Sequence, residues 1–245
     1  MKNNTAITFE GVSISLSKTP ILFDMDLSIP EGMIYGLLGP SGAGKTTTVK
    51  IAAGILEGMP KEGIRVLGSQ MPSLDVMKDI GYMAQEEALY TDLTGLQNIE
   101  FFGTLYGLKK DKLKNRAAEV LDLVFLTEDK DKLVSKYSGG MKRRLSLAIS
   151  LVHEPKLLIL DEPTVGIDPV LRQTLWNKLY DLAKDGKTIL VTTHVMDEAE
   201  KCHRLAMIRD GRVIGEGSPA ELKKECGLDS MEEVFLNLSK KEVSL

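Results

Sequence analysis

Two kinds of hydrophobic spacing divide the chain. Short apolar runs bounded by glycine predict strands in the N-terminal third: AITFEGVSISL (6–16), MIYGLLG (33–39), GIRVLG (63–68) and IGYMAQ (80–85). Between residues 94 and 152 the spacing becomes helical, as in DKLKNRAAEVLDLVF and MKRRLSLAISLV. Strands and helices then alternate through KLLILDEP, PVLRQTLWNKLYDLAKDG, TILVTTH, MDEAEKC and RLAMIRDG.

The runs KLLIL and TILVTT are apolar without alternation, which suits strands buried on both faces of a parallel sheet. We therefore predict an α/β fold with an N-terminal antiparallel β portion and a mostly helical insertion. The whole chain, 1–245, is expected to form one domain. Its core would be residues 1–93 and 153–220, its helical part 94–152 and its C-terminal helical tail 221–245, ending in the amphipathic stretch SMEEVFLNLSKKEVSL.

Composition narrows the class of protein. The 245 residues carry a net charge of −4, so no basic excess points to a nucleic-acid partner. No apolar run approaches the roughly 18 residues needed to cross a bilayer, and the N-terminus lacks a signal-peptide core. Two cysteines, Cys202 and Cys226, form no paired motif and are expected to be packing residues. These features predict a cytoplasmic protein.

A glycine-rich stretch, GPSGAGKT at residues 39–46, matches G-x-x-x-x-G-K-[ST] at every fixed position. It lies between a predicted strand and a predicted helix, and we call it the P-loop. Glycines allow successive N–H groups to turn toward phosphates, and the helix adds the positive end of its dipole. In this pattern Lys45 reaches the β- and γ-phosphates and the Thr46 hydroxyl ligates Mg²⁺. The stretch therefore predicts a nucleoside triphosphate site.

Two carboxylates end the strand LLILDEP. Asp161 would sit beside the Mg²⁺ as its acidic anchor. Glu162, directly after it, can polarise an attacking water, which predicts an ATPase instead of a passive binder. The alternative is a pair of solvated acids at a strand end.

A second glycine pair lies in YSGGMKRR, at residues 137–144. Ser138, Gly139 and Gly140 precede a predicted helix, so their N–H groups and hydroxyl form another potential anion site. The alternative is an ordinary helix N-cap by Ser138. Taken alone, the stretch favours the N-cap.

The order of four features changes this assessment: the P-loop, Gln85 ending the strand IGYMAQ, SGG about twenty residues before LLILDEP, and His194 ending the strand TILVTTH. This order resembles the nucleotide-binding subunit of an ATP-binding cassette (ABC) transporter over essentially the whole chain. The resemblance implies a P-loop NTPase ABC cassette with a RecA-like core. In its terms residues 39–46 are the Walker A loop, 137–141 the signature loop and 165–168, VGID, the D-loop.

The resemblance also implies what the motifs do. The cofactors would be ATP and Mg²⁺, and the signature loop would close on the ATP held by the partner in a head-to-tail homodimer. Glu162 and His194 would be catalytic. Thr46, Gln85 and Asp161 would serve the metal. The residues implied to contact nucleotide are Gly39, Pro40, Ser41, Gly42, Ala43, Gly44, Lys45, Thr46, Thr47, Leu16, Ser138, Gly139, Gly140, Met141 and Asp168.

Three positions depart from the common family pattern. The signature loop reads YSGGM, with Tyr137 for leucine and Met141 for glutamine, and the D-loop reads VGID in place of SALD. The position that usually stacks an aromatic ring on adenine is Leu16, although Phe9 or Phe23 could supply the ring instead. Weak base selectivity is therefore expected.

Within this family, the chain is most similar to the ABC-2 branch of drug, lipid and polysaccharide exporters. The similarity lies in the stretches SGGMKRRLSLA, TVGIDP, THVMDEAE and MEEVFLNL. A separate transmembrane permease is then implied, docking between Gln85 and Tyr106 and holding the chain on the cytoplasmic face of the membrane. Aromatic residues gather there as anchors or as a small core: Tyr82, Tyr90, Phe101, Phe102 and Tyr106. We expect the basic run KKDKLKNR to be a solvated helix face, and His153 and His203 to be surface or packing residues.

Two rival functions use the same P-loop. A soluble ABC ATPase acting on nucleic acid or ribosomes usually carries a second cassette, a coiled-coil or zinc insertion, or a basic surface, and none is visible here. A P-loop kinase has no need of SGG before the second acidic motif. The sequence therefore favours a transporter ATPase without a nucleic-acid partner.

Overall fold

The computed structural model describes residues 4–56, 60 and 62–242, and its strands form two sheets. The four-stranded sheet has the order β2-β1-β4-β5, and the six-stranded sheet the order β10-β9-β3-β8-β7-β6. The strands are β1 (Thr5–Leu16), β2 (Thr19–Pro30), β3 (Ile34–Leu38), β4 (Ile64–Val66), β5 (Ser69–Gln70), β6 (Ile80–Met83), β7 (Leu157–Asp161), β8 (Thr188–Thr193), β9 (Arg204–Arg209) and β10 (Arg212–Gly217).

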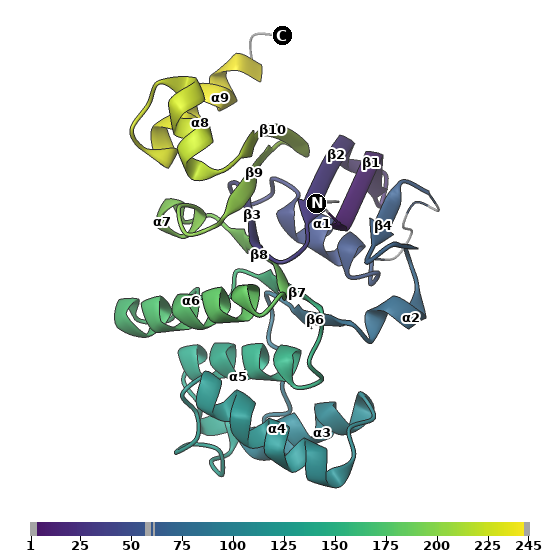
Figure 1. Ribbon diagram of the computed structural model, residues 1–245, viewed down its shortest axis with the longest axis vertical. Coiled ribbons are helices and arrows are strands. Elements are labelled where there is room, and N and C mark those ends of the chain that lie inside the picture. The colour runs from purple at the N-terminus through teal and green to yellow at the C-terminus, as the bar shows by residue number, and fades with distance from the viewer. Residues whose placement is uncertain (1–3, 57–59, 61, 243–245) are drawn as a thin grey trace.

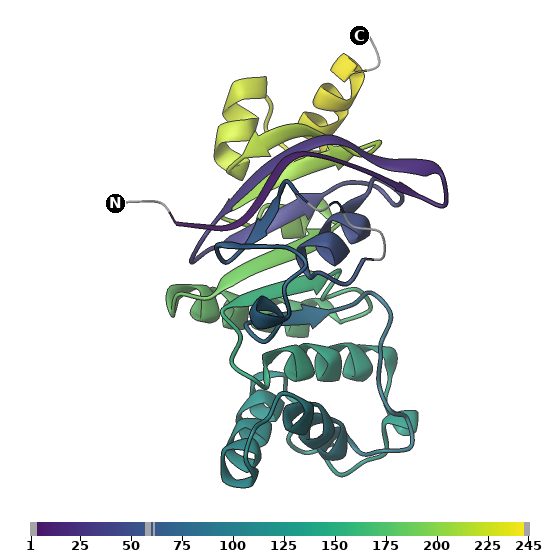
Figure 2. The same ribbon diagram turned by 90° about the vertical axis from the view of Figure 1, so that its right-hand side faces the viewer.

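Five strands of the six-stranded sheet run parallel, and β10 pairs with β9 antiparallel. The four-stranded sheet is antiparallel throughout, and its β1–β2 hairpin lies across one side of the molecule (Figure 2). The expected α/β fold with an antiparallel N-terminal portion is confirmed. Parallel strands need crossover connections, and helices supply them.

The helices of residues 94–152 and those of the C-terminal segment lie at opposite ends of the molecule (Figure 1). Figure 1 shows α3, α4 and α5 together at one end of the molecule, with α8 and α9 at the opposite end. No helix in the described ranges is long and apolar enough to cross a membrane. The helices are α1 (Lys45–Ala52), α2 (Leu74–Met77), α3 (Gly95–Leu105), α4 (Lys110–Leu123), α5 (Gly139–Leu151), α6 (Pro169–Lys184), α7 (Met196–Ala199), α8 (Pro219–Cys226) and α9 (Met231–Glu242).

Each central parallel strand is buried on both faces, as its unbroken apolar run predicts. On β7, Leu158 and Leu160 join the apolar cluster that includes α4, α5 and α6, while Leu157 and Ile159 join the cluster beneath β1, β2 and α1. All five residues of β7 and all six of β8 are buried. Polar chemistry is therefore confined to the strand ends.

Several elements were missed or misjudged from the sequence, among them β2, β10 and α7; the short elements β5 and α2 were not predicted either. The strand β2 carries Asp24 and Asp26 on its exposed face, which interrupts the apolar run. The edge strand β10 is only partly buried and so lacks a clear apolar pattern. It is recognised as a strand by its antiparallel pairing with β9. The stretch MDEAEKC forms only the four-residue helix α7.

The C-terminal segment packs on the core. Met231 and Val234 of α9 are buried in the cluster that contains α6 and β9, and Leu222 of α8 joins them. The expected amphipathic helix therefore has a docked apolar face. Residues 243–245 of the expected tail, and 1–3 at the other end, lie outside the described residues.

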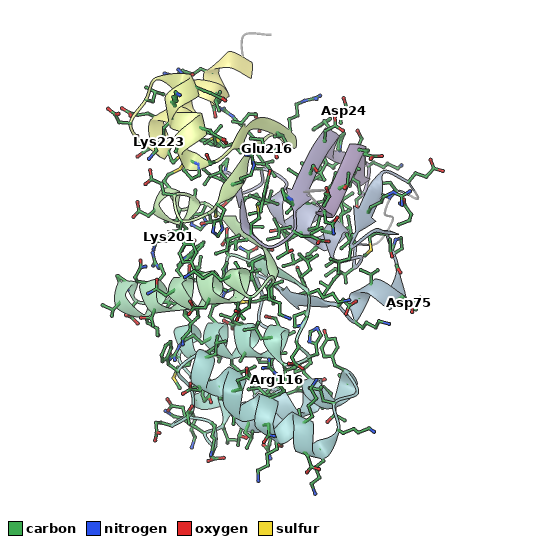
Figure 3. All side chains as sticks on the ribbon, viewed as in Figure 1. Asp24, Asp75, Arg116, Lys201, Glu216 and Lys223 are labelled. Carbon is green, nitrogen blue, oxygen red and sulfur yellow. The ribbon has the colours of Figure 1, made fainter. Side chains whose placement is uncertain are left out.

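The basic run of α4 is not wholly a solvated face, which corrects the expectation. Arg116, labelled in Figure 3, is 13% exposed in its side chain and donates hydrogen bonds to the carbonyl oxygens of Leu151 (2.8 Å) and Val152 (3.3 Å). These carbonyls close α5, where helix geometry leaves them without partners. Its neighbours Lys112 and Lys114 are exposed.

The cysteines are buried or half buried as expected, and of the two histidines His153 is half buried and His203 exposed. Burial raises the pKa of the Cys202 thiol to about 12, and Cys226 is a half-buried free thiol. His203 accepts a hydrogen bond from the N–H of Ile34. His153 stacks on Tyr106 with ring centroids 3.6 Å apart, and burial lowers the pKa of His153.

Candidate functional site

The P-loop joins the end of β3 to the start of α1, and two of its positions have no room for a side chain. A Cβ on Gly39 would lie 2.2 Å from the carbonyl oxygen of Ile208, and one on Gly44 would lie 2.6 Å from Leu22. Gly44 caps α1 in the left-handed region, with φ of 106°. The sequence pattern therefore corresponds to a tight backbone turn at a helix N-terminus, as expected.

Lys45 lies inside this turn. Its side chain is folded back, and Nζ donates to the carbonyl oxygens of Gly39 (2.8 Å) and Pro40 (2.9 Å). Burial lowers the pKa of Lys45, while the negative charges of Glu162 and Asp161 act in the opposite direction. On binding a phosphate, the Lys45 ammonium group would give up these two neutral carbonyl acceptors for a charged phosphate oxygen. Hydrogen bonds to a charged acceptor are stronger.

Asp161 ends β7 fully buried and keeps one oxygen for another ligand. Its Oδ1 accepts from the hydroxyl of Thr192, whereas Oδ2 is buried and makes no hydrogen bond to the described residues. A buried, half-satisfied carboxylate is costly unless a cation or donor completes it. Thr46 and Gln85, which line the P-loop cavity, offer further oxygen atoms.

This oxygen-only donor set fits Mg²⁺, which prefers oxygen ligands and is commonly held by one or two carboxylates, waters and substrate phosphates. Among the described residues no cluster of three or more His, Cys, Asp or Glu could hold a metal alone. A site of this kind would need the nucleotide to complete the coordination of the ion.

Glu162 is held in an unusual conformation at the mouth of the P-loop cavity. Its φ is 52°, a left-handed value that is uncommon for a residue with a side chain. Its carboxylate pairs with Nδ1 of His194 at 2.9 Å and accepts from Nε2 of Gln85 at 3.3 Å. The cavity, of about 230 Å³, has Glu162 and Gln85 on its wall with Lys45 and Thr46. Strained backbone of this kind is concentrated at functional sites.

The signature loop lies in a different cavity. Ser138 caps α5 by accepting a hydrogen bond from the N–H of Met141, as the N-cap alternative expects. Its hydroxyl and the two glycines also line a cavity of about 460 Å³, together with D-loop residues including Asp168, whose side chain caps α6. The folded chain therefore does not bring its signature loop and its P-loop into one cavity.

Leu16 lies apart from both cavities among the described residues. It ends β1, is half buried, and packs on the apolar cluster beneath the antiparallel sheet. Ile21 is the β2 residue that lines the P-loop cavity instead. The contact of Leu16 with a nucleotide base stays a prediction.

Sequence reasoning missed a buried carboxylate that connects Thr164, the residue before the D-loop, to Thr193 at the end of β8. Glu198 of α7 is 2% exposed and accepts hydrogen bonds from the hydroxyls of Thr164 and Thr193, the latter at 2.7 Å. Arg172 of α6 lies 3.9 Å away. The stretch MDEAEK looks like an exposed acidic helix, so only the fold reveals this contact.

Arg143 was missed for the same reason. It follows the signature loop in a basic stretch, yet it is 5% exposed and its guanidinium points at the ends of β6 and β7. Its bonds are described below. A charged residue on a helix flanked by Lys142 and Arg144 gives no sequence signal of burial.

Comparison with known proteins identifies relatives of the whole chain. Residues 22–165 match the family model described as "ABC transporter". The chain is 40% identical over 232 residues to the Nod factor export ATP-binding protein I of Paraburkholderia xenovorans, covering 93% of this chain and 76% of that one. It is also 40% identical over 236 residues to the daunorubicin resistance ATP-binding protein DrrA3 of Streptomyces coeruleorubidus, covering 95% and 74% respectively.

A solved structure shares the fold. The dimeric post-hydrolysis state of the ATP-binding cassette MJ0796, bound to ADP and phosphate, superposes with a TM-score of 0.79 at 26% identity. The match covers 86% of this chain and 98% of that one.

Glu198→Ala tests the connection that Glu198 makes between Thr164 and Thr193. We expect it to lower the free energy of unfolding by about 3 kcal/mol or more, because it leaves two buried hydroxyls without their acceptor and Arg172 without its ion-pair partner. For a chain of this size that is a fall of roughly 2–4 °C in Tm per kcal/mol. The control is Asp197→Ala, at an exposed neighbour, which should change Tm little. Equal Tm values for the two variants would contradict the connection.

Proposed function

The chain belongs to the ABC transporter family and therefore binds and hydrolyses ATP; from this premise we propose that it drives export through a separate membrane-spanning subunit. The observation that carries the proposal is the position of Glu162. Its carboxylate contacts both Gln85 and His194 and lines the same cavity as Lys45. A base beside a phosphate loop supports turnover as well as binding.

We propose that the polar residues in and beside the P-loop cavity have separate tasks in ATP hydrolysis. The P-loop N–H groups and Lys45 hold the phosphates, and Glu162 accepts a proton from the attacking water, which His194 helps to orient. Asp161, Thr46 and Gln85 would hold Mg²⁺, which would supply charge neutralisation at the phosphates. The unpaired Oδ2 of Asp161 supports this assignment.

The two separate cavities support the proposed dimer. One chain presents its P-loop in one cavity and its signature loop in another, and a second copy would supply a signature loop to each P-loop. In a head-to-tail pair each signature loop would meet the partner's nucleotide, and two-fold symmetry would give two equal sites. The dimeric MJ0796 cassette, with ADP and phosphate bound, supports this assembly by similarity.

A groove beside Gln85 suits the proposed permease. It has a volume of about 220 Å³ and is mostly apolar, with the hydroxyls of Tyr82 and Ser146 buried in its wall without hydrogen bonds to described residues. We call it the docking groove, and a cytoplasmic segment of the permease could bring both apolar side chains and the missing polar partners. It is lined by Tyr82, Met83, Ala84, Glu86, Ala88, Leu89, Phe102, Tyr106, Ser146, Ile149 and Ser150.

The aromatic residues near this groove form a small cluster as well. Tyr90 and Phe101 meet edge to face with centroids 4.7 Å apart, and Phe101 and Phe102 do so at 5.3 Å. Tyr90 and Phe101 are 48% and 38% exposed, so they retain area for a partner. Both sequence alternatives, a local core and an anchor surface, are compatible with this arrangement.

We propose export over import because the similar proteins named above are an export protein and a drug-resistance protein. The chain would then act at the cytoplasmic face of the membrane, bound to its permease. The division into core 1–93 and 153–220, helical part 94–152 and tail 221–245 would let the helical part move with the permease. The rival function on nucleic acid or ribosomes is not favoured, given the net charge of −4.

The catalytic assignment is tested by Glu162→Gln. We expect the variant to bind ATP with a Kd within about threefold of the native value, because the metal ligands and P-loop remain, while kcat falls by roughly 10² or more. Light scattering should show an ATP-bound dimer that accumulates. The matched control is Glu128→Gln, at an exposed residue of the helical part that lines neither the P-loop cavity nor the signature-loop cavity. A kcat for Glu162→Gln within about threefold of native would remove Glu162 as the base.

The in-trans role of the signature loop is tested by mixing two inactive variants. Gly139→Asp would repel the partner's phosphates, and Lys45→Ala would lose the chain's own grip on nucleotide. A mixed dimer retains one site with an intact Lys45 from one chain and an intact glycine pair from the other. We expect mixtures to regain part of the native ATPase rate. If mixed dimers are shown to form but have no ATPase activity, the proposal that one site completed in trans is enough for hydrolysis is contradicted.

The docking groove is tested by Ala88→Lys. Ala88 is exposed at the groove wall, so a lysine should fold normally and leave Tm within about 2 °C, a change below roughly 1 kcal/mol. We expect it to abolish co-purification with the proposed membrane-spanning subunit. Ala118→Lys, at an exposed position of α4, is the matched control and should co-purify as the native chain does. Retained co-purification by Ala88→Lys would exclude the groove as the dock.

The proposed base contact of Leu16 is tested with two nucleotides. A leucine offers only apolar contact, whereas aromatic stacking on a base contributes roughly 1–3 kcal/mol. We expect kcat/KM for GTP to lie within about tenfold of that for ATP, a difference of roughly 1.4 kcal/mol. Leu16→Tyr should lower KM for both without raising kcat. An unchanged KM in this variant would mean that the base is held elsewhere, for which Ile21 is the first candidate.

A further inference from the structure

Arg143 joins the signature helix to the backbone of the catalytic site. Its Nε and Nη2 donate to the carbonyl oxygen of Glu162 at 3.1 and 2.6 Å, and Nη2 also donates to that of Asp161. Its Nη1 donates to the carbonyl oxygens of Ala84 (3.0 Å) and Gln85 (2.7 Å). One buried side chain of α5 therefore contacts two neighbouring segments of the P-loop cavity.

These bonds use the full capacity of a guanidinium group, which has five N–H donors in a fixed planar fork. The carbonyls that it binds lie at or just beyond the ends of β6 and β7, where the sheet ladder stops. Buried carbonyls at this place need donors from outside the sheet. A lysine has only three donors on one nitrogen and could not reproduce the arrangement.

We propose that Arg143 is a positioning residue of the ATPase: from the signature helix it fixes the backbone of Gln85 and Glu162, and so sets the places of their side chains in the chain's own site. The Gln85 side chain is exposed and that of Glu162 is 12% exposed, and both line the cavity wall. They hydrogen-bond to each other, so a shift of either backbone segment would disturb both side chains. The helix that carries Arg143 begins at the signature loop, one turn earlier. A shift of that helix would therefore move the chain's own catalytic residues. The proposal rests on the roles proposed above for Glu162 and Gln85.

A purely structural role for Arg143 is the alternative, and the chain offers a matched control. Arg116 also fastens α5 to α4 by donating to backbone carbonyls, those of Leu151 and Val152, but at the far end of α5. Its side chain is 13% exposed. The two arginines are therefore similar in chemistry and anchor the same helix, and only Arg143 touches the site.

The first experiment compares Arg143→Lys with Arg116→Lys in the full chain, measuring Tm, the Kd for ATP without Mg²⁺, and kcat at saturating MgATP. We expect Arg143→Lys to lower kcat by about tenfold or more, since a 1 Å misplacement can cost roughly 10²-fold. Its Kd should stay within about threefold, a difference below roughly 0.7 kcal/mol, because the P-loop is untouched. Arg116→Lys should keep kcat near native even where Tm falls.

The second experiment uses mixed dimers to separate the chain's own site from its partner's. Arg143→Lys impairs the site that holds its own P-loop, so it should restore activity when mixed with Gly139→Asp and fail to restore it with Lys45→Ala. A substitution that acted through the signature loop would give the reverse pattern. Arg143→Gln, assayed in the same way, replaces the lysine variant if that variant does not fold.

Three results would overturn the proposal. They are a kcat of Arg143→Lys equal to that of Arg116→Lys, a loss of nucleotide binding in step with kcat, and restoration of activity with Lys45→Ala. Glu162→Gln is measured in parallel to test the underlying site. If Glu162→Gln remains active, the proposed base is wrong; if it is inactive while Arg143→Lys is native-like, only the positioning role is wrong.

Discussion

Four parallel strands end at the same edge of the six-stranded sheet, and the rest of the site depends on this constraint. The P-loop follows β3, Gln85 follows β6, Asp161 and Glu162 end and follow β7, and His194 follows β8. Open α/β sheets bind ligands at the carboxyl ends of their strands because the loops there are free of the sheet ladder. Side chains far apart in the sequence therefore meet around one cavity.

Burial on both sheet faces makes this edge the place where polar groups can act. Along β7 and β8 every side chain is buried, and the first carboxylate appears at the last residue of β7. The fully buried Asp161 accepts one bond from Thr192 and leaves one oxygen unpaired. One residue later the chain adopts the left-handed conformation of Glu162, which directs a second carboxylate toward Gln85 and His194. Two adjacent acids thus acquire different surroundings, one buried beside the sheet and one at the cavity mouth.

The helical part is connected to that edge by a few polar contacts as well as by apolar packing. Arg143 donates to the ends of β6 and β7, and Arg116 closes the other end of the same helix. Glu198 makes a comparable connection between Thr164, just before the D-loop, and Thr193 at the end of β8. Because all three charges are largely buried, each needs its partners to remain in place. The arrangement of the loops is therefore specified by hydrogen bonds with defined geometry.

The sequence by itself determined the α/β class, the doubly buried strands and the P-loop, since these depend on local periodicity and on backbone conformations that only glycine allows. It also placed Asp161, Glu162, Gln85 and His194 at strand ends. Only the tertiary structure decided that Arg143, Arg116 and Glu198 are buried, that β2 and β10 complete the sheets, and that the two phosphate loops lie in separate cavities. The physical reason is that the sequence around a charged helix residue looks the same whether its side chain is hydrated or hydrogen-bonded inside the protein. Its partner is fixed by the path of the chain in space.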